Sequence, residues 1–276
     1  MGDAPPLPEG EDRWALFLDI DGTLVAIAAT PQEVRVEPGL RPLLERLQAG
    51  CDGALALVSG RSLAGIDALF RPLRLPAAGL HGWERRRADG TAAATGEPTA
   101  RLAPLRPRLA AFIATRPGLL IEDKQGSLAL HYREAPRYAA AVRRFARELA
   151  AADPELRLIG GRKVVEFQPR GMDKGQAIAA FLAEPPFLGR RPIYAGDDAT
   201  DEDGFATVNR LDGLSIRVLG SETRRRASAA RYALPSVTAL HDWLATLADH
   251  WALSARASGT DRDEGAGTAA FHRALS

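Results

Sequence analysis

Residues 14–23, WALFLDIDGT, decide the fold, because they join a buried strand to a pair of carboxylates. The first five are apolar at successive positions, which is typical of a strand covered on both faces. Asp19 and Asp21 follow directly, and a glycine comes next. Ligands of open parallel sheets bind beyond the carboxyl ends of the strands, so this stretch predicts an anionic site. A plain turn of Asp and Gly is the alternative.

Further apolar runs predict strands of the same sheet at 54–58 (ALALV), 192–195 (PIYA) and 214–219 (LSIRVL). Apolar residues at helical spacing predict helices around 40–47 and 237–247, the second with Ser236 as its N-cap. Short apolar strands that alternate with helices favour an α/β fold with a doubly wound, largely parallel sheet.

The middle of the chain interrupts this alternation with a helix–strand–strand pattern that occurs twice. Apolar periodicity predicts helices around 102–112 and 138–149, and strands at 119–123, 127–132, 156–159 and 163–168. Short glycine-containing links at 124–126 and 160–161 indicate antiparallel hairpins. We expect the two helices to cover one face of this sheet and leave the other free to meet a ligand.

An inserted α+β domain of pattern αββαββ is the simplest account of this interruption. We expect the insertion to span residues 99–170, the core to combine residues 1–98 with 171–254, and residues 255–276 to form a flexible tail rich in Gly, Ala and charged residues.

Composition excludes several classes of protein. Of 276 residues, 46% are hydrophobic and 26% charged, which excludes a disordered chain. A formal net charge of +1 gives no bulk attraction to nucleic acid or membranes, and no apolar run approaches the roughly 20 residues that cross a bilayer. Cys51 is the single cysteine, which excludes an internal disulfide and fits a reducing compartment. We expect a cytoplasmic protein that acts as a monomer.

Two further motifs stand at predicted strand ends and helix starts. Ser59-Gly60-Arg61 offers a hydroxyl and a glycine turn that can cradle a phosphate, although an ordinary strand-to-helix turn has the same composition. Lys174 lies in the first turn of a helix, where a cation opposes the helix dipole. A nearby anion or pair of carboxylates would explain that placement, and a solvated surface lysine is the alternative.

The most acidic stretch, residues 194–203 (YAGDDATDED), follows a short apolar strand. Five acids within residues 197–203 repel one another unless a cation compensates them. A hard divalent ion does so, and Mg²⁺ typically takes one or two carboxylates plus waters and phosphate oxygens. The later acids also suit the first turn of a helix. Asp197 at the strand tip is the candidate metal ligand.

Taken in order, DxDGT at 19–23, SGR at 59–61, the Lys174 helix start and GDDxTDE at 196–202 resemble the four motifs of haloacid dehalogenase-like (HAD) phosphatases. GLHG at 79–82, EDK at 122–124, HYR at 131–133 and EFQPRGMDKG at 166–175 narrow the resemblance to the trehalose-6-phosphate phosphatase family, over roughly residues 14 to 250. Gln168 departs from this pattern, because many members carry a basic residue there.

The resemblance implies Mg²⁺-dependent hydrolysis of trehalose 6-phosphate through an aspartyl phosphate, the last step of trehalose synthesis. Asp19 would be the nucleophile. Asp21 would protonate the leaving sugar and then deprotonate the attacking water. Mg²⁺ would bind the side chains of Asp19 and Asp197 and the backbone carbonyl of Asp21.

The same resemblance implies supporting roles for other residues around the phosphate. Ser59 and Lys174 would hold phosphoryl oxygens, and Arg61 would contact the substrate. Asp198 and Asp201 would orient the metal's water shell and Lys174 rather than bind the metal directly.

Sugar recognition is expected on the inserted domain. Alternation along a strand places Glu122 with Lys124 on one face, and Glu166 with Gln168 on one face of another strand. In the family such residues contact the distal glucose, which we carry over to Glu122, Lys124 and Glu166. Arg133, which shares a face with His131, is a weaker candidate. His81, between two glycines, would either line the cleft or fill a turn.

Three alternative readings remain open from the sequence. Another sugar-phosphate phosphatase, of the sucrose-phosphate or Cof-like type, shares the core motifs. A signalling module phosphorylated on Asp19 shares the doubly wound sheet but needs neither Asp21 nor an inserted domain. A catalytically inactive regulatory domain would not need the intact acidic motifs. Arg85–Arg87 and Arg224–Arg226 are short basic runs typical of solvated faces, so no nucleic-acid partner is expected.

Overall fold

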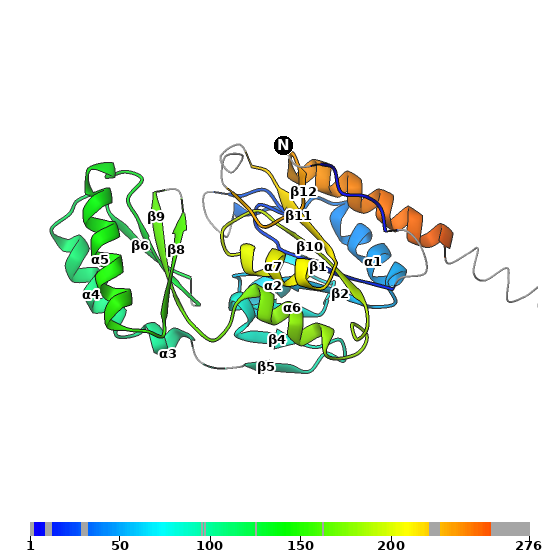
Figure 1. The fold of residues 1–276 in the computed structure, drawn as a ribbon, viewed down its shortest axis with the longest axis horizontal. Helices are drawn as coiled ribbons and strands as arrows, with labels where there is room; N and C mark the ends of the chain where they lie inside the picture. Colours follow the sequence, from blue (N-terminus) through cyan, green and yellow to red (C-terminus); the bar gives the residue numbers. More distant parts are fainter. Residues whose placement is uncertain are drawn as a thin grey trace, which may run out of the picture.

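The structure, a computed structural model, describes residues 3–8, 13–28, 33–94, 96, 98–124, 126–161, 163–220 and 227–254. The chain forms a larger part built on one sheet and a smaller part built on another, and each part has its own hydrophobic cluster (Figure 1). The predicted tail at 255–276 lies outside the described residues. Within the described part, no helix combines the length and apolar character that a membrane span requires.

The larger sheet confirms the predicted doubly wound α/β core. Its strand order is β12-β11-β10-β1-β2-β3-β4-β5. β1 (Trp14–Leu18) lies between β10 (Arg191–Gly196) and β2 (Leu55–Val58), and all three run parallel. The parallel set continues with β11 (Leu214–Val218), β12 (Tyr232–Leu234) and β3 (Ala77–Gly79).

The sheet ends in two short antiparallel strands that the sequence analysis did not predict. They are β4 (Glu84–Arg86) and β5 (Ala92–Ala94). β3 and β12 were not predicted either. Each of these strands has three residues, too few to display a two-residue period.

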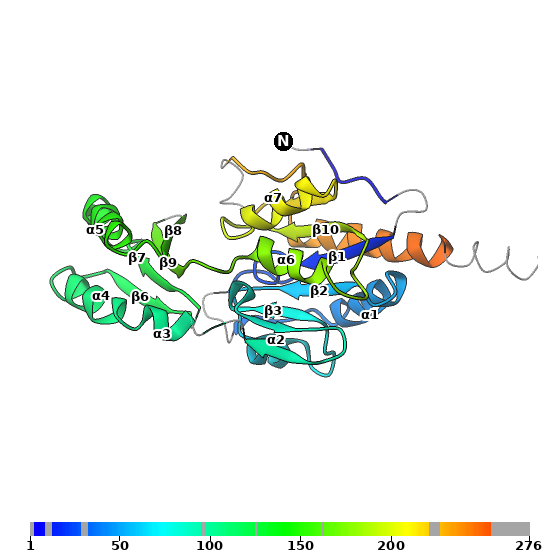
Figure 2. The same ribbon diagram turned by 60° about the horizontal axis from the view of Figure 1, so that its bottom comes forward.

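Helices cover both faces of the larger sheet (Figures 1 and 2). α6 (Lys174–Leu182) and α7 (Glu202–Arg210) pack side by side on one face. α1 (Leu40–Gly50) and the helix at 237–254 meet on the other, where the Trp251 side chain lies so close to Gly50 that a Cβ there would come within 3.0 Å of it. α2 (Leu63–Phe70) links β2 to β3. The Ser236 hydroxyl accepts a hydrogen bond from the backbone N–H of Ala239, so its predicted role as an N-cap is confirmed.

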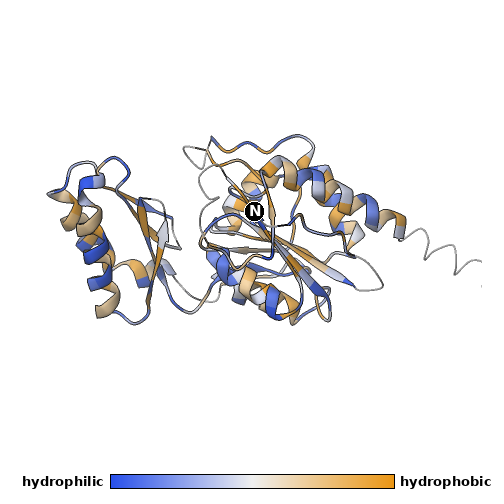
Figure 3. Cartoon of the chain, turned by 45° about the horizontal axis from the view of Figure 1, so that its top comes forward, coloured by the Kyte–Doolittle hydropathy of each residue, from blue (hydrophilic) through white to orange (hydrophobic). Residues whose placement is uncertain are grey.

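Apolar residues concentrate on the central strands of the larger sheet, which Figure 3 colours mostly orange, and their side chains form one buried cluster. Every residue of β1 is buried, as its continuous apolar run predicts. Phe17 on β1 stacks on Phe187, with ring centroids 5.5 Å apart, and the ring of Phe181 packs against both. This aromatic cluster fastens α6 to the sheet close to Asp19.

The smaller sheet has the predicted antiparallel hairpins. Its order is β6 (Leu120–Asp123), β7 (Leu128–His131), β9 (Val164–Pro169) and β8 (Leu156–Gly161), and each neighbouring pair is antiparallel. One predicted link was wrong: Gly160 and Gly161 belong to β8, where Gly161 pairs with Val164. Because glycines tolerate a strand backbone, their presence alone did not locate the turn.

The helices of the smaller part are α3 (Pro98–Leu102), α4 (Leu105–Ala114) and α5 (Ala139–Ala152). The helix predicted around 102–112 is therefore divided in two. α4 and α5 lie on one side of the small sheet, away from the larger part (Figure 1). Strand residues such as Leu130 and Phe167 join the cluster beneath them, and alternation turns Glu122 and Glu166 to the opposite face.

The aromatic cluster around Phe187 makes a stability prediction. Phe187→Ala should lower the free energy of unfolding by about 3–5 kcal/mol, because it empties a fully buried space between two rings. Leu188→Ala, at the neighbouring residue with 60% of its surface exposed, should cost less than about 0.5 kcal/mol. Urea unfolding followed by circular dichroism measures both. Similar losses in the two variants would contradict the packing described.

Candidate active site

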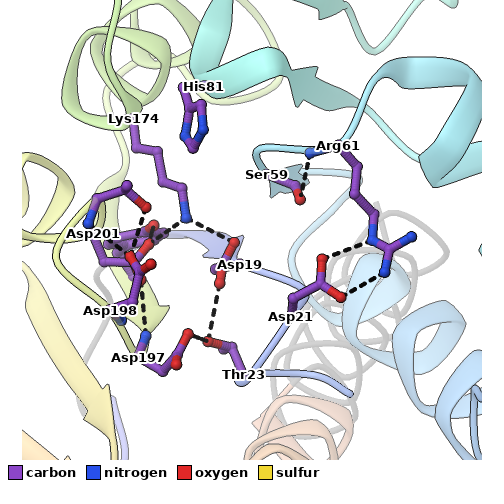
Figure 4. Close-up of polar contacts among 12 residues, drawn as sticks. Asp19, Asp21, Thr23, Ser59, Arg61, His81, Lys174, Asp197, Asp198 and Asp201 are labelled. Carbon is purple, nitrogen blue, oxygen red and sulfur yellow. Dashed lines mark hydrogen bonds and ion pairs between the residues drawn. The ribbon is translucent and has the colours of Figure 1, made fainter. Parts of the chain in front are cut away.

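The parallel register of β1 and β10 brings together the acidic loops that follow these two strands. Leu18 pairs with Ala195, so Asp19 and Asp197 leave the sheet at the same edge. The Thr23 hydroxyl lies 3.2 Å from Asp19 Oδ2 and 3.5 Å from Asp197 Oδ1 (Figure 4). Gly22 has a φ of +82°, and any side chain there would collide with the Asp197 carboxylate.

Asp19, Asp197 and Asp201 form an acidic triad. Each offers a carboxylate oxygen within 4.8 Å of the others, and all three side chains are buried. Burial raises the pKa of Asp19 and of Asp197, and repulsion from neighbouring carboxylates adds to this rise. Close, buried carboxylates with oxygen ligands to offer fit a hard divalent cation, which would allow them to remain ionised together.

Asp201 has its oxygens occupied by protein donors. Oδ1 accepts hydrogen bonds from Lys174 Nζ at 2.6 Å and from the Tyr194 hydroxyl. Oδ2 accepts from the backbone N–H groups of Asp197 and Asp198, each at 2.9 Å. Asp19 and Asp197 are therefore the better placed of the triad to bind a cation, and Asp201 organises the loop around them.

Lys174 is the cation of this cluster. It is 3% exposed, and its Nζ donates to Asp19 Oδ1 at 2.8 Å as well as to Asp201. Burial alone would lower the pKa of Lys174, but attraction to Asp19 and Asp201 outweighs burial and raises that pKa well above its ordinary value. These two carboxylates explain why a lysine stands at the start of α6.

Asp21 lies apart from the triad and pairs with Arg61 (Figure 4). Arg61 Nε donates to Asp21 Oδ2 at 2.7 Å and Nη2 donates to Oδ1 at 2.6 Å. The buried Ser59 hydroxyl accepts from the backbone N–H of Arg61 at 3.2 Å. Arg61, expected to contact the substrate, is thus engaged with another residue of the site.

Asp198 behaves differently from Asp201. It is exposed, and its Oδ1 accepts from both the backbone N–H and the hydroxyl of Thr200 at 2.7 Å. In the described part of the chain no hydrogen bond joins Asp198 to Lys174, so of these two acids it is Asp201 that holds the lysine directly.

Polar residues of the small sheet gather around Glu166, which faces the larger part. Glu166 accepts from Gln168 Nε2 at 2.8 Å and from Lys124 Nζ at 3.4 Å. Burial would raise the pKa of Glu166, but attraction to Lys124 and these hydrogen bonds outweigh it and lower the pKa to about 2. With its pKa lowered in this way, Glu166 is an ionised, buried carboxylate. On the same sheet, Glu122 Oε2 lies 2.9 Å from His131 Nε2.

His81 connects the two parts of the molecule. Its Nε2 lies 3.7 Å from Glu166 Oε1, and its ring occupies the space that a side chain at Gly60 would need. His81 has a φ of 58°, and burial lowers its pKa to about 4, so the ring is neutral near pH 7. Its buried Nδ1 has no hydrogen-bond partner among the described residues.

Arg133 is not brought to this group. It is exposed, two positions beyond the end of β7, and within the described residues it forms no ion pair with Glu122 or Glu166. Three hydroxyl groups that hold the acidic loops in place were not among the predicted site residues, those of Thr23, Tyr194 and Thr200. Each lies inside a motif already quoted, but a buried hydroxyl donor has no periodic signal.

Ion pairs outside the site also join the two parts. Arg157 on β8 lies 2.5 Å from Asp203 on α7 and 4.0 Å from Asp173. Arg101 on α3 adds a cation–π contact, with its guanidinium 5.2 Å from the centroid of the Trp83 ring of the larger part. These contacts hold the polar face of the small sheet towards the acidic edge of the large one.

Comparison with known proteins gives consistent results. The family model described as trehalose-phosphatase matches residues 17–238. The chain is 42% identical to a trehalose-6-phosphate phosphatase of Escherichia coli K12 (86% of this chain, 87% of that protein) and 48% identical to a probable trehalose-phosphate phosphatase of Sinorhizobium fredii (86% and 88%). A solved trehalose-6-phosphate phosphatase related protein superposes with a TM-score of 0.64 at 26% identity, covering 87% of this chain and 99% of that one.

Because Asp201 and Asp198 have different contacts, their replacement by asparagine should lower the free energy of unfolding by different amounts. Asp201→Asn should lower the free energy of unfolding by about 3 kcal/mol, because Lys174 stays buried with half of its compensating charge. Asp198→Asn, at an exposed residue that only caps a turn, should cost about 1 kcal/mol or less. Urea unfolding without added metal measures both. Equal costs would mean that Asp201 does not anchor Lys174.

Proposed function

We propose a mechanism for this site from one premise: the chain belongs to the trehalose-phosphatase family. It is a phosphoric monoester hydrolase, and its reaction is the hydrolysis of trehalose 6-phosphate to trehalose and phosphate. The observation that carries the proposed mechanism is the meeting of Asp19, Asp197 and Lys174 at one sheet edge, opposite the polar face of the small sheet.

Asp19 is proposed as the nucleophile. Its carboxylate attacks phosphorus, the phosphorus–oxygen bond to the sugar breaks, and Asp21 gives a proton to the departing sugar oxygen. Water then attacks the phosphorus of the phosphorylated Asp19 and gives a proton to Asp21. The bond between Asp19 and phosphorus breaks, and inorganic phosphate leaves with both residues restored.

Lys174 and Ser59 are proposed to hold the phosphoryl oxygens, on which the transition state concentrates negative charge. Lys174 is supported in this role by its fixed position between Asp19 and Asp201. Asp201 acts through Lys174 and is a positioning residue. Asp198 is proposed to act only on the solvent shell of the site.

We propose Mg²⁺ as the cation, held by the carboxylates of Asp19 and Asp197 and the backbone carbonyl of Asp21. The buried acidic triad and the space that Gly22 leaves beside Asp197 support this donor set. When bound, Mg²⁺ neutralises charge, so that an anionic carboxylate and an anionic phosphate ester can approach each other.

The small sheet is proposed to recognise the sugar, with residues 99–170 as the specificity domain. Glu122, Lys124 and Glu166 offer two acceptors and a donor on a face that already points at the acidic edge, which suits a polyhydroxylated ligand. Neutral His81 would line the cleft between the two parts. Arg133 has no geometric support as a sugar contact.

The alternative readings differ in what they need from this site. A sucrose-phosphate or Cof-like phosphatase would use the same acidic edge with another sugar. A module phosphorylated on Asp19, or an inactive regulatory domain, would need neither the Lys124–Glu166 pair nor Asp21. Cytoplasmic location and a monomeric state stay predictions.

A substrate panel tests the proposed function. The kcat/KM for trehalose 6-phosphate should exceed that for sucrose 6-phosphate and for glucose 6-phosphate at least about 10-fold. A chelator should abolish phosphate release from trehalose 6-phosphate, and added Mg²⁺ should restore it. Colorimetric phosphate assay of the purified protein measures each rate. Faster turnover of sucrose 6-phosphate would instead favour the alternative phosphatase.

Glu122 tests sugar recognition separately from chemistry. Glu122→Ala should lower kcat/KM for trehalose 6-phosphate at least about 10-fold, because the small sheet loses a carboxylate acceptor for the sugar. The kcat/KM for 4-nitrophenyl phosphate, which has no sugar, should change by less than about 2-fold. Glu134→Ala, at an exposed residue of the same part, is the matched control and should change neither. A parallel loss on both substrates would refute the assignment of Glu122.

A further inference from the structure

We propose that Arg61 is a positioning residue for Asp21 and not a ligand of the substrate phosphate. The inference rests on the proposed function, because Asp21 matters only if it carries the proton between the sugar oxygen and water. Arg61 opposes Asp21 with two hydrogen bonds, one to each carboxylate oxygen, at 2.7 and 2.6 Å. Such a fork fixes both the distance and the plane of a carboxylate.

Arg61 is itself held firmly. Its backbone N–H donates to the buried Ser59 hydroxyl, and its carbonyl accepts from the N–H of Leu80 at 2.9 Å. Gly79 lies so close that a side chain there would come within 2.8 Å of the Arg61 carbonyl oxygen. The Arg61 side chain is 16% exposed, against 39% for Asp21. The backbone of Arg61 is therefore anchored, and its less exposed side chain offers Asp21 a partner with two points of contact.

Charge explains why Asp21 needs such a partner. Lys174 is already bonded to Asp19 and Asp201 and does not reach Asp21 in the described structure. Without Arg61, the Asp21 carboxylate would stand unpaired beside the buried triad. In Figure 4 the Asp21 carboxylate points towards Arg61 and away from Asp197 and Asp201. The pair thus holds the Asp21 carboxylate apart from the acidic triad.

The fork also constrains the proton transfer. Each oxygen of Asp21 accepts one hydrogen bond from the guanidinium and keeps a second lone pair, so one oxygen can carry the proton to the sugar oxygen on its free lone pair. Both hydrogen bonds can persist and keep the carboxyl at the edge of β1. A lysine could offer a point charge but not this two-point contact. The geometry therefore points to a role for the arginine fork itself.

A double-mutant cycle tests this proposal. The wild type, Arg61→Gln, Arg61→Lys, Asp21→Asn and the Asp21→Asn/Arg61→Gln double variant are assayed with trehalose 6-phosphate and Mg²⁺, with excess enzyme for the slow variants. Arg61→Gln should lower kcat about 10- to 100-fold with KM within about 2-fold, and Arg61→Lys should restore little of it. In the Asp21→Asn background, Arg61→Gln should change the rate less than about 2-fold.

Two results would overturn the role of Arg61. The first is a raised KM with kcat retained, which would make Arg61 a substrate ligand. The second is an Arg61→Gln effect of the same size with and without Asp21. If Asp21→Asn alone keeps the wild-type kcat, the proposed function fails instead. Arg74→Gln, at an exposed arginine 3.7 Å from Asp67, is the matched control and should leave kcat unchanged. Thermal unfolding of each variant establishes that it is folded.

Discussion

The burial of several carboxylates around a single ammonium is the constraint on which the rest of this structure depends. Asp19, Asp197 and Asp201 meet where β1 and β10 end, and Lys174 lies between two of them. Like charges repel strongly in a low-dielectric site, so these carboxylates need hydrogen-bond donors and a cation close to their oxygens. Asp201 takes two backbone N–H groups, a tyrosine hydroxyl and the lysine, which leaves the other two acids for a cation.

The face of the small sheet that lies towards these acids carries both positive and negative side chains. Lys124 and Glu166 are ion-paired there, and His81 from the larger part lies against Glu166. One of the contacts between the parts, that of His81 with Glu166, therefore involves a residue proposed to bind sugar. Sugar bound as proposed would contact the small sheet and the acidic triad at once, and so help to exclude water from the proposed phosphoryl transfer.

Local patterns predicted the elements that are long and buried. The apolar runs at β1, β2, β10 and β11 and the repeated helix–strand–strand pattern both appear in the structure. Three-residue strands such as β4 and β5 escaped because so few residues show no period. Gly160 and Gly161 misplaced a turn, because glycine fits an extended backbone as well as a reversal.

Sequence by itself determined which chemical groups stand at the strand ends, because a strand and the loop after it are contiguous in the chain. Tertiary structure alone decided how those groups are paired. Asp21 and Arg61 are separated by 40 positions, and Lys174 and Asp19 by 155. No local spacing encodes such contacts. The order of the strands and the burial around them assigned Arg61 to Asp21 and Asp201 to Lys174, since side chains far apart in the chain meet only when the sheet forms.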